Sequence, residues 1–150
     1  MTHCAQAFLT AFLMAACAAQ AAETQAPRID ATDWAGGSMV CAAWRLDDPG
    51  GAAPVWLGLP AAVAPFGMRG YAGIDGATRP LRQIAYARTG TGLAIHYRTL
   101  GERAYDVRLD LAGPAPDGGM TGRLTVSRFG VAASLELRAE CAAGALPKAQ

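Results

Sequence analysis

The sequence predicts an all-β fold: a small antiparallel meander barrel of seven to eight strands, with a two-sheet sandwich as the alternative. Several segments alternate apolar and polar residues with a period of two, as strands do when they bury one face. Turn residues, chiefly Gly and Pro, fall between these segments, and no window has helical periodicity. A meander must bury its apolar face, either by closing into a barrel or by folding into two sheets.

The clearest alternation runs from Val131 to Cys141. Three other segments show it almost as well: residues 93–99, 105–111 and 123–127. Earlier segments show it more weakly: residues 39–46, 54–59, 68–74 and 81–88. Short Gly-containing connections at residues 89–92 and 129–130 suit hairpins. We favour the barrel because the first and last segments, which carry Cys41 and Cys141, can then lie side by side and remove the open edge.

The first two dozen residues predict an export signal. Residues 1–22 contain no Asp, Glu, Lys or Arg, and an apolar run from Ala5 to Ala16 is followed by small residues. A membrane span needs a longer run, about 20 apolar residues. Ala19-Gln20-Ala21 fits a cleavage site. The expected organisation is a signal peptide at residues 1–21, a flexible lead-in at 22–33, one β domain at 34–143 and a C-terminal tail at 144–150.

A lipoprotein signal is the alternative for the same segment. Leu13-Met14-Ala15-Ala16-Cys17 resembles the site at which bacterial lipoproteins are cleaved and lipidated, which would give a signal of residues 1–16 and a lipid on Cys17. The two alternatives predict different destinations: the periplasm or the medium, or a lipid anchor in the outer membrane. The composition, with Lys148 as the only lysine and abundant Ala, Gly and Arg, is typical of a GC-rich bacterial genome.

Two cysteines remain after the predicted signal, Cys41 and Cys141. An even number of cysteines in an exported protein favours a disulfide. The bond would close a loop of about 100 residues, a constraint worth roughly 4–5 kcal/mol in the chain-entropy model. Buried free thiols are the plainer alternative.

No motif identifies an enzyme, a cofactor or a metal site. No serine lies in a Gly-x-Ser-x-Gly elbow, and His96 is expected to be an outward polar residue of a strand. The cysteines lack the spacing of a zinc site. The formal net charge of +1 gives no field that would select nucleic acid or an anionic membrane. We therefore expect no cofactor, no nucleic-acid partner, and membrane contact only through a lipid anchor.

Two features could carry binding. Six arginines against two acids lie between residues 79 and 108, and on neighbouring strands they would form a basic stripe that includes Arg82, Arg88, Arg98 and Arg108. Trp44 and Trp56 belong to an aromatic group near the start of the domain, and such residues recur in binding surfaces. The alternatives are a solvated face in an Arg-rich protein and aromatic residues that pack the core.

Trp34-Ala35-Gly36-Gly37 contains the elements of the lipocalin Gly-x-Trp motif in another order. Small periplasmic inhibitors of C-type lysozyme resemble this chain in having cysteines near both ends of a compact barrel. Their Ser-Gly motif is absent, so no residue role carries over. The expected fold is lipocalin-like or similar.

The function we expect is a non-enzymatic exported domain that binds a protein or an envelope component. The first alternative is a carrier of a small apolar ligand in the barrel, and an envelope hydrolase is a lesser one. An interior cavity of about 300 Å³ or more would favour the carrier, and a filled interior would favour the binder. The oligomeric state stays open.

Overall fold

The computed structural model describes residues 25–33, 39–48, 53–59, 68–114 and 119–142. The expected signal peptide with Cys17 and the expected tail at residues 144–150 lie outside these ranges. Within them the chain forms nine strands and no helix. The strands are β1 (Ile29–Asp30), β2 (Cys41–Arg45), β3 (Trp56–Gly58), β4 (Met68–Ile74), β5 (Ala77–Thr89), β6 (Gly92–Thr99), β7 (Asp106–Pro114), β8 (Met120–Arg128) and β9 (Val131–Cys141).

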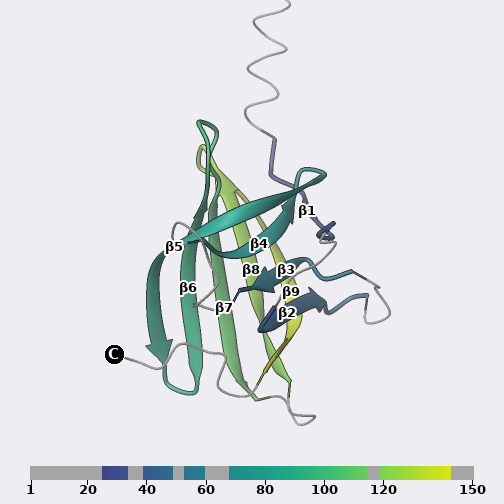
Figure 1. Ribbon diagram of the computed structural model, residues 1–150, viewed down its shortest axis with the longest axis vertical. Helices are drawn as coiled ribbons and strands as arrows, with labels where there is room; N and C mark the ends of the chain where they lie inside the picture. The colour runs from purple at the N-terminus through teal and green to yellow at the C-terminus, as the bar shows by residue number, and fades with distance from the viewer. Residues whose placement is uncertain (1–24, 34–38, 49–52, 60–67, 115–118, 143–150) are drawn as a thin grey trace, which may run out of the picture.

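Strands β2 to β9 close into an antiparallel barrel, as the sequence predicts (Figure 1). Each strand pairs with the next along the chain, and β2 pairs with β9 to complete the ring. The described part of the chain is therefore an up-and-down meander barrel with one additional short strand. It is not a sandwich.

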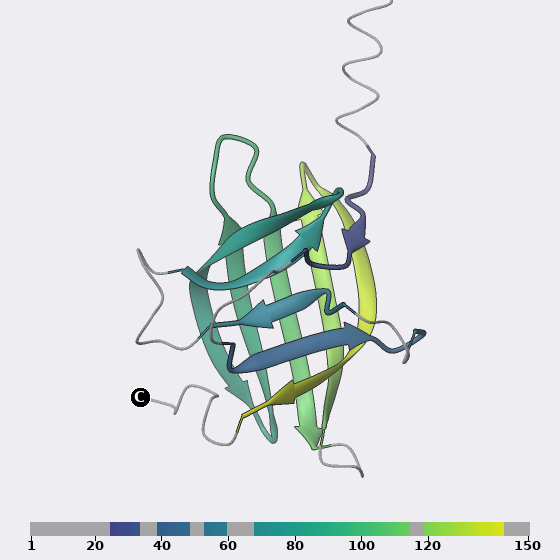
Figure 2. The same ribbon diagram turned by 45° about the vertical axis from the view of Figure 1, so that its right-hand side comes forward.

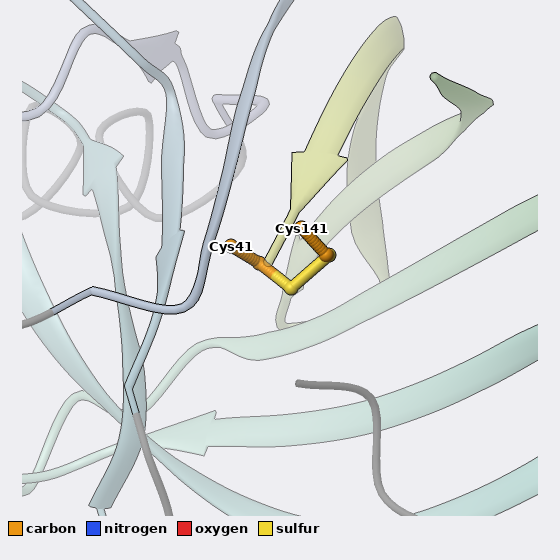
Figure 3. The surroundings of a disulfide bond; sticks show 2 residues. All are labelled: Cys41 and Cys141. Atoms are coloured by element: carbon orange, nitrogen blue, oxygen red, sulfur yellow. A yellow bond between two sulfur atoms is a disulfide. The ribbon is translucent and has the colours of Figure 1, made fainter. Parts of the chain in front are cut away.

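A disulfide between Cys41 and Cys141 joins the two strands that close the barrel (Figure 3). The two residues are direct partners in the β2–β9 ladder, and their Cα atoms are 4.0 Å apart. That spacing is close to the value for an antiparallel pair without its own hydrogen bonds. The predicted bond and its place at the seam are both confirmed.

Buried side chains pack the core of the barrel. Trp56 and Tyr97 pack together in the interior, with ring centroids 6.3 Å apart. Other inward residues are 0% exposed: Leu81, Val107, Leu109, Leu124, Val126 and Leu137. A cavity large enough to hold water would expose the side chains that line it, so these residues border none.

Strand β1 was not expected, because residues 22–33 have the composition of a flexible lead-in. Figure 2 shows it beside the end of β4. Ile29 is buried and pairs with Ile74, and Asp30 pairs with Gly73. A Cβ on Gly73 would overlap the carbonyl oxygen of Asp30, so glycine permits this close approach. Part of the expected lead-in is thus a strand of the fold.

Strand β5 is longer than predicted and contains an irregularity. It begins at Ala77 because Asp75 and Gly76, with φ angles of 51° and 73°, form a tight turn after β4. Its register with β6 shifts between Gln83 and Ala85, which leaves Ile84 as an extra residue. The shift changes which side chains of β5 face outward.

Candidate functional site

The outer wall of β5, β6 and β7 brings together three of the four arginines of the expected stripe. Apolar residues of these strands point into the barrel, so the alternate residues point outward. Arg82 lies directly opposite Arg98 in the β5–β6 ladder. Arg108 lies opposite His96 in the β6–β7 ladder. These side chains therefore occupy one face.

An open groove of about 490 Å³ lies on this wall. Small residues, Ala85, Ala87 and Ala94, form part of its lining. Polar side chains from three strands complete it: His96, Asp106, Arg108, Thr125 and Ser127. Because alanine side chains are short, the longer neighbours stand above them and the wall is hollowed there. We call this hollow the β5–β8 groove.

Most of the positive charge around the groove is paired. The guanidinium of Arg98 lies 3.1 Å from the Asp106 carboxylate, and His96 Nε2 lies 3.4 Å from the same carboxylate. Arg108 Nε donates to Asp110 Oδ2 at 2.8 Å. These side chains are about half exposed, so water screens each pair and each contributes little to stability.

Arg82 is the exception. It is exposed on β5, and within the described residues it has no carboxylate partner. Its direct neighbour across the ladder is another cation, Arg98. Like charges directly opposite each other destabilise a sheet. Because Arg82 has no carboxylate partner among the described residues, its positive charge at this edge of the groove is uncompensated.

The structure removes Arg88 from the basic stripe. By simple alternation Arg82 and Arg88 would share a face of the strand. The extra residue at Ile84 reverses the alternation, and Arg88 pairs with Leu93, whose side chain points inward. Arg88 lies near the end of β5, where it is exposed, but on the opposite face from Arg82.

The two tryptophans do not form a surface with these arginines. Trp56 is 2% exposed and belongs to the core, so the prediction that it contributes to a surface is wrong. Trp44 is partly exposed on β2, opposite Arg138 of β9. Strands β9 and β8 separate it from the β5–β7 wall. An indole side chain is large enough to fill much of a small core, which explains why Trp56 is buried.

The groove contains residue types used by hydrolases, but not their arrangement. His96, Asp106 and Ser127 all line it. His96 contacts Asp106 as a half-exposed, outward residue, as the sequence predicts. Within the described residues Ser127 makes no hydrogen bond to His96, whereas an activated serine needs a base within reach. In the described residues, His96 is therefore paired with Asp106 and Ser127 has no base beside it.

A second polar cluster lies at the end of the barrel, at the Asp75–Gly76 turn. The Tyr105 hydroxyl donates to Asp75 Oδ2 at 2.5 Å and accepts from Arg128 Nη1 at 2.8 Å. The guanidinium groups of Arg79 and Arg128 lie 5.0 and 4.8 Å from the centre of the Tyr105 ring. We call these four residues the Tyr105 cluster.

The Tyr105 cluster was not predicted, although the sequence places two arginines at inward positions of strands. Arg128 continues the apolar face of Leu124 and Val126, and Arg79 continues the face of Leu81. A positively charged side chain at an inward position of a strand needs hydrogen-bond or ion-pair partners, so it indicates a polar cluster there.

The cluster shifts the pKa values of Asp75 and Tyr105 in opposite directions. Burial works against the ionised form of Asp75, yet the Arg28 amide, the Tyr105 hydroxyl and the positive charges of Arg128 and Arg79 outweigh it, and the pKa of Asp75 falls below its ordinary value. Burial and the hydrogen bond to Asp75 raise the pKa of Tyr105. Asp75 is therefore ionised and Tyr105 protonated at neutral pH.

Within the described ranges, no three His, Cys, Asp or Glu side chains gather closely enough to hold a metal ion. None of the described segments forms a helix long and apolar enough to cross a membrane. No protein-family model, curated protein or solved structure matches this chain.

Proposed function

We propose that this protein is an exported, non-enzymatic binding module that contacts its partner through the β5–β8 groove and the arginines beside it. The observation that carries the proposal is the contrast between the two sides of the barrel wall. The core side chains on the inner face are buried, whereas the outer face carries a groove of about 490 Å³ with the unpaired cation Arg82 beside it.

Export rests on two independent features. The N-terminal residues have the composition of a signal, with Ala19-Gln20-Ala21 as the cleavage site and Cys17 as the lipidation site of the alternative. The Cys41–Cys141 disulfide fits an oxidising compartment outside the cytoplasm. Together they support the periplasm or the medium as the destination, with an outer-membrane lipid anchor as the alternative.

The filled interior favours a binder over a carrier of apolar ligands. A ligand-carrying barrel needs an internal cavity of several hundred Å³. Six inward leucines and valines are instead 0% exposed and leave no room for a ligand between them: Leu81, Val107, Leu109, Leu124, Val126 and Leu137. A ligand in this part of the interior would have to displace packed side chains.

The partner chemistry that suits the groove is anionic. Arg82 has no carboxylate partner within the described residues, and Arg98 shares Asp106 with His96. Guanidinium groups bind carboxylates and phosphates in a planar, bidentate manner. An acidic surface of an envelope protein, or an anionic envelope component, would supply the compensating charge.

Replacing the two opposed arginines tests the proposal. Purified, disulfide-bonded protein is immobilised and exposed to an envelope extract of the source bacterium. We expect the double variant Arg82→Gln/Arg98→Gln to bind the retained species at least about tenfold more weakly, because it removes the two opposed positive charges beside the groove. Retention is quantified by mass spectrometry and affinity by titration.

A matched control is Arg45→Gln/Arg138→Gln. These arginines are also exposed and paired with neighbouring carboxylates, but they lie on β2 and β9, away from the groove. The control changes the net charge equally and is expected to bind like the wild type. Equal losses in both variants would contradict the proposed surface. Retention of nothing by the wild type would contradict the binder itself.

A further inference from the structure

A pocket of about 290 Å³ lies beside the Tyr105 cluster, separate from the β5–β8 groove. It is lined by Gln25 and Ala26, by Arg28 before β1, by Asp75 of the β4–β5 turn and by Arg128 at the end of β8. Segments from the start, the middle and the end of the described chain therefore meet around it.

Arg128 is an incompletely satisfied cation in this pocket. Its Nη1 donates to the Tyr105 hydroxyl, but its Nε is buried and has no hydrogen-bond acceptor. Within the described residues no carboxylate lies within ion-pair distance of its guanidinium, unlike the other arginines that pair with neighbouring acids. A buried donor without an acceptor costs free energy, and the cost is greatest for a charged group.

The nearby carboxylates do not supply the missing acceptor. Both oxygens of Asp75 are already engaged: Oδ2 accepts from Tyr105, and Oδ1 accepts from the Arg28 amide at 2.7 Å. Asp30 pairs with the Arg28 side chain at 2.6 Å. Arg79 and Arg128 therefore face one carboxylate between them, and the cluster retains an excess of positive charge.

We propose that this pocket binds a small oxyanion, a carboxylate or phosphate group, held by the guanidinium of Arg128 with Arg28 beside it. The guanidinium of Arg128 lines the pocket, and its planar shape suits a group with two oxygens. The Tyr105 ring holds the guanidinium in place from one side.

The test is a titration of the purified protein with sodium phosphate, and in a second series with sodium acetate, followed by NMR. The reporters are the Nε–Hε resonance of Arg128 and the backbone amide of Arg28. Sodium chloride at equal ionic strength is the reference, which removes simple screening. We expect saturable shifts of both reporters with at least one oxyanion and not with chloride.

Two variants locate the site. Arg128→Gln is expected to weaken oxyanion binding by about tenfold or more, because it removes the guanidinium. Arg123→Gln is the control, because Arg123 lies on the same strand, faces outward and pairs with Glu136. It should leave binding unchanged.

The proposal is overturned if the shifts are linear in concentration or equal in chloride. It is also overturned if Arg128→Gln binds phosphate and acetate like the wild type. Should Arg128→Gln fail to fold, the wild-type comparison of oxyanions with chloride still decides, because it needs no variant.

Discussion

Loss of the Cys41–Cys141 disulfide is expected to lower the free energy of unfolding by about 4–5 kcal/mol in the double variant Cys41→Ala/Cys141→Ala. The bond joins the two strands that close the barrel and lie farthest apart in sequence, with a separation of 100 residues. Without it, the unfolded chain regains the entropy of an open loop, and the β2–β9 seam depends on its ladder alone. Urea unfolding followed by circular dichroism measures the change.

The wild-type protein under reducing conditions is the matched control, because it keeps both sulfur atoms in place. It should lose nearly as much stability as the double variant, which would assign the loss to the covalent link rather than to a cavity at the buried Cys41. An unchanged urea midpoint after reduction would show that the seam does not depend on the bond.

Trp56→Ala is expected to destabilise the barrel by about 3–5 kcal/mol, the range for removing a large buried aromatic side chain. Trp56 is 2% exposed and packs against Tyr97 across the interior. It also lies against Gly58, where an added Cβ would come within 2.8 Å of its ring. Residues around a deleted core side chain usually collapse only partly, so a cavity adds to the loss of buried apolar surface.

The control for this variant is Trp44→Ala, which removes the same side chain from the partly exposed outer face of β2. We expect it to cost at most about 1 kcal/mol, as is usual for substitutions near a surface. The comparison uses thermal and urea unfolding of both variants. Equal destabilisation by the two variants would show that the loss of stability does not depend on the interior position of Trp56.

The strands could be predicted where one face of the sheet is buried and the other is exposed to solvent. Val131 to Cys141 alternates clearly, and β9 covers those residues. The pattern was weaker where both faces are covered: every residue of β3 is buried, so apolar residues follow one another without alternation. Turn residues still bounded that segment, and its existence was predicted.

Two other features of the fold could not be predicted. Strand β1 has two residues, too few for a period, and it exists because Gly73 lets the chain approach β4 closely. Pro80 obscured the first part of β5, since proline cannot donate to a ladder and usually excludes a central strand. Both features depend on neighbours that are distant in the sequence.

Part of the candidate site could be predicted from the regular alternation of inward and outward residues. Arg82, Arg98 and Arg108 share a face because regular alternation and the meander order place them there. The register shift at Ile84 then moved Arg88 to the opposite face, and a single-residue irregularity leaves no pattern in composition. The Tyr105 cluster joins β5, β8 and the residue before β7 with the β4–β5 turn, and only the closed barrel brings them together.

Export, together with closure by a disulfide, is the central claim about this chain. Intact mass measurement tests it directly, on protein isolated from the envelope fraction of the source organism and alkylated without reductant. We predict a chain that begins at Ala22, with Cys41 and Cys141 both unalkylated; a diacylated chain that begins at Cys17 would identify the lipoprotein alternative. A chain that still begins at Met1 with both cysteines alkylated would contradict the account.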